Sequence, residues 1–315
     1  MADKLICCIC HEPVEEPFNV LGGRLYCAKH YASVNKPHVG FWRAGVIQII
    51  GMAIFSLIVA AIAGTLGPLD RTAQLVIGLF LAIVPSALWL WYFYRQDRLE
   101  PEPKMYIGLV FVAALVLTDF LALRVINDWF QVGVWASANT WTSLFASILI
   151  NGFIVQACMY IAVRLVYAGS EFDERMDGIV YGTVAGLGVA TLLNLHYIID
   201  NQGVALVPGV VTTVTTALAQ ASFGGLMGWF MADDKFSQRP FWFVPLGFAI
   251  AAILNGLFSW LTNEVSATGL AVEPFRSLIL GLVVALATFG ALVWLMNRST
   301  EVTLRRKANP QGGTG

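Results

Sequence analysis

Long apolar stretches alternate with short polar ones along most of the chain. A transmembrane helix needs about 20 mostly apolar residues to cross the hydrocarbon core of a bilayer. We predict such helices at 43–66, 72–94, 105–123, 143–167, 178–199, 208–231, 243–263 and 277–297. Charged or Pro/Gly-rich segments separate them. The pattern therefore predicts an all-α polytopic membrane protein with about eight transmembrane helices.

The composition agrees with this fold class and excludes several others. Of the 315 residues, 57% are hydrophobic and only 12% are charged, whereas an ordinary soluble domain has about 25% charged residues. The net charge is −1, so the chain has no basic excess with which to hold nucleic acid. The first expected partner is the lipid bilayer.

The basic residues are distributed unevenly between the two sides of the predicted helices. If the N-terminus is cytoplasmic, the inner side carries 15 of the 19 Lys and Arg residues. Basic residues that flank transmembrane helices favour the cytoplasmic side. We therefore expect a multi-pass integral membrane protein with both termini in the cytoplasm, a transmembrane domain over 43–297 and a flexible tail over 298–315.

Residues 1–36 differ from the rest and hold four of the five cysteines. Sixteen residues separate a Cys7-x2-Cys10 pair from a Cys27-x2-His30 pair. Two close pairs joined by a loop can surround one tetrahedral Zn²⁺. The alternative is a disulfide or free thiols, and a reducing cytoplasmic location disfavours the disulfide.

Segment 23–31, Gly-Arg-Leu-Tyr-Cys-Ala-Lys-His-Tyr, resembles the second half of a LIM zinc finger. We therefore expect a half-LIM-like zinc knuckle over 1–36, in which Cys8 and His11 are competing ligand choices. The expected ligands are Cys7, Cys10, Cys27 and His30. Four protein ligands leave no open position for chemistry, so the zinc would be structural and the knuckle would offer a surface to a cytoplasmic partner.

Polar side chains inside transmembrane helices are the first place to look for function. The fourth to seventh spans each place an amide well inside the helix, at Gln156, Asn194, Gln220 and Asn255. Such amides indicate either interhelical hydrogen bonds or a shared polar centre. Small residues also recur every fourth position of the fifth span, at Gly178, Gly182, Gly186 and Ala190. This spacing predicts close packing against a neighbouring helix.

Two stretches resemble the signature of the PrsW-type intramembrane proteases. Residues 97–104 read Asp-Arg-Leu-Glu-Pro-Glu-Pro-Lys. Residues 171–188 contain Glu-Phe-Asp-Glu, then Asp-Gly-x-x-Tyr-Gly and then Gly-Leu-Gly. The match runs from about residue 75 to the end of the seventh span. This resemblance implies an enzyme similar to the CAAX-processing proteases, which would cut membrane proteins with Glu and His residues as a metal-dependent or glutamate-type hydrolase.

The motif positions of that family hold different residues in this chain. The Glu-Glu-x-x-Lys motif falls on 156–160, the Glu-Asn pair on 193–194, the next His on 220 and the final His-x-x-x-Asn on 255–259. These positions are occupied by Gln156, Ala157, Tyr160, Leu193, Asn194, Gln220, Asn255 and Ser259. Amides take up no proton near neutral pH and bind divalent metals weakly, so they cannot replace a general base or the ligands of a metal-bound hydroxide.

We therefore expect no catalytic residues and a pseudoprotease that binds or scaffolds another membrane protein or a transmembrane segment. One alternative is an active protease with relocated residues such as His196, Asp119 or Glu264, which all lie near predicted outer ends of helices. The second alternative is an accessory subunit of a larger membrane complex.

Overall fold

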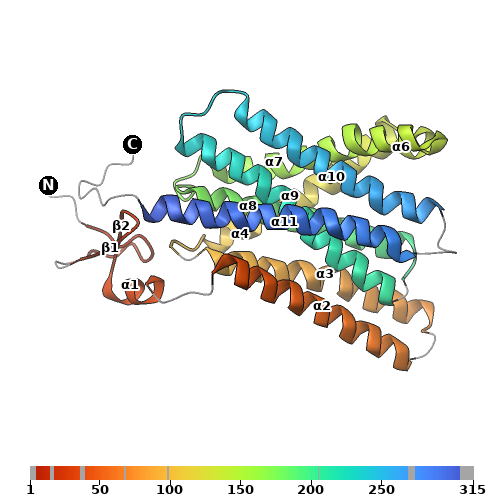
Figure 1. Cartoon of the computed structure of the whole chain (residues 1–315), viewed down its shortest axis with the longest axis horizontal. Helices are drawn as coiled ribbons and strands as arrows, with labels where there is room; N and C mark the ends of the chain where they lie inside the picture. The colour runs from red at the N-terminus through yellow and green to blue at the C-terminus, as the bar shows by residue number, and fades with distance from the viewer. Residues whose placement is uncertain are drawn as a thin grey trace.

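A computed structural model gives the fold and describes residues 5–14, 18–35, 40–66, 69–97, 99–204, 206–268 and 274–305. Within these ranges, eight helical segments are long and apolar enough to cross a membrane, which confirms the predicted polytopic fold. They pack side by side as one bundle, and a small unit from the N-terminal region lies at one end of it (Figure 1).

Six of the eight spans are single α-helices. They are α2 (Phe41–Leu66), α3 (Arg71–Gln96), α8 (Arg175–Asp200), α9 (Leu206–Phe236), α10 (Phe243–Thr268) and α11 (Pro274–Leu304). The last helix continues seven residues beyond the predicted end at 297. Its final turns lie outside the apolar stretch but pack against the N-terminal unit, so part of the expected tail is helical.

The third and fourth spans contain π-helical segments. The third consists of α4 (Lys104–Leu117), η1 (Thr118–Leu123) and η2 (Val125–Trp129). The fourth consists of α6 (Thr140–Phe145), η4 (Ala146–Gly152) and α7 (Phe153–Tyr167). The short segments α5 (Val132–Trp135) and η3 (Ala136–Ala138) connect them. Helical structure thus extends beyond the predicted end at 123, because charged residues near an interface do not by themselves stop a helix.

Helix α8 forms the centre of the bundle. In its most apolar window 89% of the residues are buried, whereas in α2 only 6% are. The small residues of α8 explain this position, because a Cβ atom at Gly182 would overlap the carbonyl oxygen of Gly224, and one at Gly186 that of Gln220. The backbones of α8 and α9 therefore touch, which confirms the close packing predicted from the four-residue spacing.

The N-terminal unit contains β1 (Asn19–Leu21), β2 (Arg24–Tyr26) and α1 (Ala28–Val34). The strands pair antiparallel, with Leu21 opposite Arg24. Gly22 and Gly23 form the turn with φ values of 60° and 83°, in the left-handed region that glycine adopts without strain. Gly22 lies against the backbone of Thr303 near the end of α11. We call residues 5–35 the knuckle and this side of the bundle the knuckle end.

Candidate functional site

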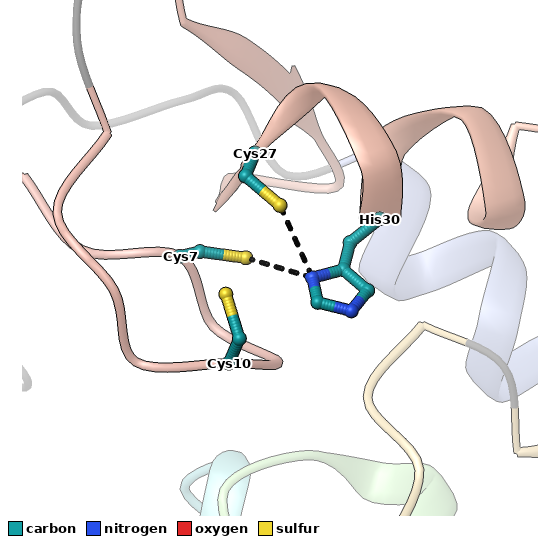
Figure 2. A group of neighbouring side chains, drawn as sticks. All are labelled: Cys7, Cys10, Cys27 and His30. Atoms are coloured by element: carbon teal, nitrogen blue, oxygen red, sulfur yellow. Dashed lines mark hydrogen bonds between the residues drawn. The ribbon is translucent and has the colours of Figure 1, made fainter.

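Four side chains of the knuckle converge on one point (Figure 2). The ligand atoms of Cys7, Cys10, Cys27 and His30 all lie within 4.8 Å of one another. The Nδ1 atom of His30 lies 3.2 Å from the Sγ atom of Cys27 and 3.5 Å from that of Cys7. Ligand atoms around a tetrahedral zinc lie roughly 3.5–4 Å apart, since Zn–S bonds are about 2.3 Å long. The group therefore fits a zinc ion.

The local structure explains why these four residues meet. Cys27 caps the N-terminus of α1, and His30 follows in the first turn of that helix. Burial raises the pKa of the Cys7 thiol, but hydrogen bonds from the backbone of Cys10, Cys27 and Ile9 outweigh this and lower it to about 6. A thiol with so low a pKa is a thiolate at neutral pH, which is the form that binds metal.

The competing ligands Cys8 and His11 lie outside this group. The backbone N–H of Cys8 donates to the carbonyl of Leu25 at 2.9 Å, which joins the first Cys segment to strand β2. His11 adopts a left-handed conformation with φ of 55° and its N–H donates to the carbonyl of Cys7. Both residues thus shape the loop around the ligand group.

A second candidate site is formed by the motif positions of the bundle, and helix α9 connects its members. The side chains of Gln220 and Asn255 donate to each other through two hydrogen bonds of 3.1 Å, and both are buried. Gln156 is fully buried and donates to the sulfur of Met227 at 3.2 Å. Asn194 donates to the carbonyl of Thr213 at 3.1 Å. Each amide of the set therefore bonds to a helix other than its own.

These amides do not form one shared centre. On α9, Thr213 lies seven residues before Gln220, and Met227 lies seven residues after it. At a rise of 1.5 Å per residue, each of these two contacts is about 10 Å from Gln220 along the helix axis. Of the four amides, only Gln220 and Asn255 contact each other. Leu193 and Ser259 are partly buried and add no hydrogen bond to this pair.

A groove of about 590 Å³ opens beside the motif positions of α7. Ala157 and Tyr160 line it together with Arg164 on the same helix, and Phe248 faces them from α10. The Tyr160 ring packs edge-on against that of Phe248, with centroids 6.0 Å apart. We call this space the α7–α10 groove. It is largely apolar, as the surface of a transmembrane segment would require.

The candidates for relocated catalytic residues lie elsewhere. Asp119 Oδ1 and His196 Nε2 are 3.1 Å apart, and both side chains are 40% exposed. His196 is ten residues along α8 from Gly186, which touches Gln220, so it lies about 15 Å from the amide pair. The third candidate, Glu264, belongs to α10, but its side chain is outside the described part of the structure.

Comparison with known proteins agrees with the signature stretches. The family model described as PrsW family intramembrane metalloprotease matches residues 101–295. The chain belongs to the PrsW family. Protease PrsW of Bacillus subtilis (strain 168) is 28% identical over 189 residues, which are 58% of this chain and 82% of the relative. Protease PrsW of Geobacillus kaustophilus (strain HTA426) is 30% identical over 184 residues, 57% of this chain and 76% of the relative. No solved structure matches the chain.

The donor atoms at the motif positions do not fit the metal that the family description implies. Gln220 and Asn255 use their amides on each other, and Leu193 offers no donor atom. The Oε1 atom of Gln156 is buried with no hydrogen-bond partner, but a neutral amide oxygen is a weak ligand. Within the described ranges, the knuckle is the only group of His, Cys, Asp and Glu side chains that is spaced for a metal ion.

Sequence analysis missed the cluster of acidic residues where the knuckle meets the bundle. The cluster lies in the two signature stretches, 97–102 and 171–177, which are rich in Asp and Glu. That richness was a usable signal, but it did not indicate that the two stretches meet or that Arg24 of the knuckle enters between them.

Proposed function

We propose that this PrsW-family chain binds a transmembrane segment of another membrane protein and does not cleave it. The observation that carries the proposal is the reciprocal hydrogen bonding of Gln220 and Asn255. The family resemblance implies histidines at these two positions, and the amides that stand there in this chain form a closed, neutral pair. Such a pair cannot accept a proton from water or hold a metal-bound hydroxide.

The α7–α10 groove supports the binding half of the proposal. It has a volume of about 590 Å³ beside two motif positions and is lined mostly by aromatic and aliphatic side chains. Arg164 lies near the last turn of α7, and its guanidinium stacks on Tyr167 at 4.5 Å. A helix of a client protein would find apolar contacts along the groove and a cation at its end.

The proposal includes a structural zinc ion in the knuckle and cytoplasmic termini. Three thiols and one imidazole form a complete tetrahedral set, and the distribution of basic residues favours the cytoplasm for the knuckle end. The knuckle is too short to have a sizeable core of its own, so a bound metal would contribute strongly to its folding.

The absence of hydrolysis is tested with purified chain in detergent, with and without added Zn²⁺. A transmembrane substrate that the Bacillus subtilis protease cuts serves as the positive control. We expect no cleavage by this chain. Metal-dependent cleavage that disappears in Gln156→Ala or Asn255→Ala would overturn the proposal, because it would place the reaction at the motif positions.

Binding is tested by photocrosslinking in membranes from a photoreactive amino acid at position 160, inside the groove. The matched control carries it at position 76, where Val76 is 61% exposed on α3. We expect one discrete, uncleaved membrane protein to be crosslinked from position 160 only. Equal labelling from both positions would show that the groove has no selective occupant.

The contact of 3.1 Å between Asp119 and His196 favours a second candidate function, an active protease with relocated residues. This pair could hold a proton-accepting imidazole in position. Cleavage that is abolished by His196→Ala and Asp119→Asn, and retained in Asn255→Ala, would select this function over the first.

A further inference from the structure

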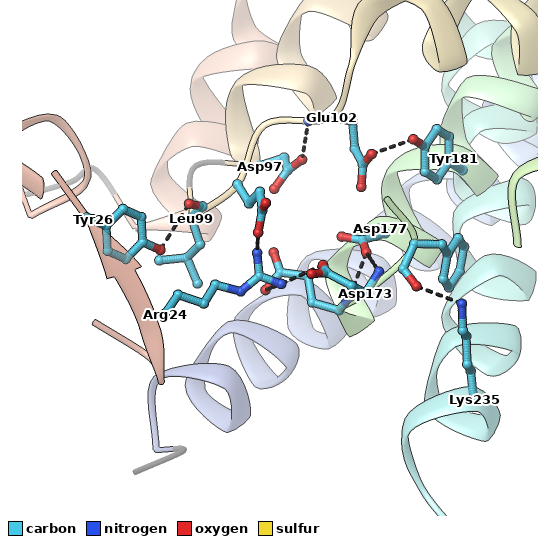
Figure 3. Close-up of polar contacts among 12 residues, drawn as sticks. Arg24, Tyr26, Asp97, Leu99, Glu102, Asp173, Asp177, Tyr181 and Lys235 are labelled. Carbon is cyan, nitrogen blue, oxygen red and sulfur yellow. Dashed lines mark hydrogen bonds and ion pairs between the residues drawn. The ribbon is translucent and has the colours of Figure 1, made fainter. Parts of the chain in front are cut away.

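The side chain of Arg24 extends from strand β2 of the knuckle into the bundle (Figure 3). Its side chain is only 15% exposed. The guanidinium pairs with Glu100, lies 2.5 Å from the Oδ1 atom of Asp173 and 3.7 Å from the Oε2 atom of Glu174. A planar guanidinium can serve several carboxylates at once. Arg24 is therefore the main ionic contact between the knuckle and the membrane domain.

Two buried carboxyl groups belong to the same acidic cluster as the carboxylates around Arg24. Asp97 and Glu102 are each 3% exposed. Burial raises the pKa of Asp97 well above its usual range, and burial together with the nearby Asp177 raises that of Glu102 to about 11. Glu102 is therefore protonated at neutral pH. Of the three carboxylates that contact Arg24, Glu174 is buried, Glu100 is half-buried and Asp173 is 46% exposed. The cation therefore matters most to Glu174, because a buried carboxylate is costly without a counter-charge.

The same carboxyl groups hold the backbone of the two signature loops. The Oδ2 atom of Asp97 accepts a hydrogen bond from the N–H of Glu102 at 3.2 Å. The Oδ2 atom of Asp177 accepts from the N–H groups of Asp173 and Glu174 at 2.7 and 2.6 Å. The backbone of both loops is thus held in place by carboxyl groups of the same acidic cluster into which Arg24 extends.

The position of Arg24 depends on the proposed metal site. Only Leu25 and Tyr26 separate it from the ligand Cys27, and Tyr26 fixes the strand by donating its hydroxyl to the carbonyl of Leu99 at 3.0 Å. The β1–β2 hairpin has only three residue pairs, which is too few for stability without support. Loss of the metal would therefore release the hairpin and Arg24 with it.

The knuckle also covers a cavity of about 300 Å³ at the knuckle end of the bundle. Leu21 and Val34 line it from the knuckle, whereas Asp97, Met176 and Asn297 line it from the membrane domain. Separation of the knuckle would open this cavity to solvent and uncover the acidic residues beside it.

We infer that Glu100, Asp173 and Glu174 form a guanidinium-binding site that Arg24 occupies in cis, so that the knuckle is a metal-dependent latch over this cavity. The inference rests on the proposed zinc ligation and is independent of client binding. With metal bound, the hairpin holds Arg24 among the carboxylates. When the metal is removed, Arg24 leaves and both signature loops loosen.

Hydrogen–deuterium exchange of the full chain in detergent tests the latch, with zinc content measured on the same samples. We expect chelation to accelerate exchange of the amides in 99–103 and 171–177 at least tenfold. Arg24→Gln is expected to give the same acceleration while keeping its zinc. The matched control is Lys29→Gln, which removes an exposed charge from the same knuckle and is expected to leave exchange unchanged.

Glu100→Gln provides a second variant that leaves the knuckle sequence intact. It is expected to accelerate exchange of the hairpin at 19–26 while the zinc content stays the same. Unchanged exchange in zinc-loaded Arg24→Gln and Glu100→Gln would overturn the guanidinium site. Exchange of the amides in 99–103 and 171–177 that stays unchanged after a verified loss of zinc would overturn the metal dependence. A chain that is purified without zinc and still shows slow exchange in these loops would overturn it as well. None of these results bears on the crosslinking from the groove, so the two proposals can fail separately.

Discussion

The Gln220–Asn255 pair makes a quantitative prediction about the bundle. Both side chains are buried at 2–3% exposure, and each donates one hydrogen bond to the other. Replacement of one member by an apolar residue of similar shape, Gln220→Met or Asn255→Leu, removes both hydrogen bonds. It also leaves the other amide buried without a partner. Replacement of both removes the bonds and the unpaired amide together.

The magnitude follows from measured energies of comparable contacts. Interhelical hydrogen bonds in membrane proteins contribute about 0.6 kcal/mol on average and at most about 1.7 kcal/mol. Two bonds therefore contribute about 1–3 kcal/mol, and an unsatisfied buried amide costs a further 1–3 kcal/mol or so. We expect each single variant to lower the free energy of unfolding by about 2–6 kcal/mol, the sum of these two contributions. The double variant should lower it by less than about 1 kcal/mol, because two apolar side chains of matching shape replace the amide pair and leave no polar group unpaired.

Equilibrium unfolding in mixed micelles with increasing SDS fraction measures these free energies. The coupling energy between the two positions, obtained from the double-mutant cycle, is expected to be at least about 3 kcal/mol, because the two single effects together exceed the effect of the double variant by that amount. Gln156→Leu is the control, because one of its amide atoms already lacks a partner, and we expect it to be neutral or slightly stabilising. Additive effects of Gln220→Met and Asn255→Leu would refute the reasoning, since they would show that the two amides do not depend on each other.

Three further predictions concern the metal, the helix contact and pH. Elemental analysis should find one zinc per chain, lost in Cys27→Ala and kept in Cys8→Ala; the reverse result would exchange the ligand assignment. Gly186→Leu should destabilise the bundle by more than about 3 kcal/mol in SDS titration, because its side chain would meet the backbone of α9. Gly108→Leu, which has open space around it, should be nearly neutral. Burial raises the pKa of Glu102 to about 11, so its stabilisation is complete below pH 4.5 and is lost as pH rises towards 11. Between pH 6 and 9 the free energy of unfolding, obtained from thermal unfolding, should therefore fall less steeply with pH in Glu102→Gln than in the unchanged chain, by up to about 1.4 kcal/mol per pH unit. An equal slope in both proteins would contradict the raised pKa.

The parts of the fold that depend on local patterns could be predicted from the sequence. Apolar stretches of about 20 residues located all eight spans, because the bilayer imposes that length. The spacing of Gly182 and Gly186 indicated the packed face of α8, since residues four apart share one side of a helix. The pairs Cys7-x2-Cys10 and Cys27-x2-His30 indicated that the four ligand atoms would meet, as they do.

The relations between distant segments could not be predicted. Helical periodicity shows which face of a helix carries an amide, but not which level of the neighbouring helix lies opposite. For this reason the sequence left open whether the four amides share one polar centre, whereas in the structure Asn194 meets Thr213, seven residues before Gln220 on α9. The entry of Arg24 between residues 97–102 and 171–177 is likewise a tertiary contact between segments more than 70 residues apart. Neither contact leaves a periodic signal in the sequence.

The contact between Gly186 and residue 220 has a consequence for how such proteins diverge. Gly186 meets the backbone carbonyl of Gln220, whereas the Gln220 side chain turns to Asn255. Position 220 thus serves packing with its main chain and chemistry with its side chain. A change of the side chain there leaves the α8–α9 backbone contact in place. The evolution of residue 220 is consequently not limited by that contact, and its cost in folding is set by the amide of Asn255 that its side chain must satisfy.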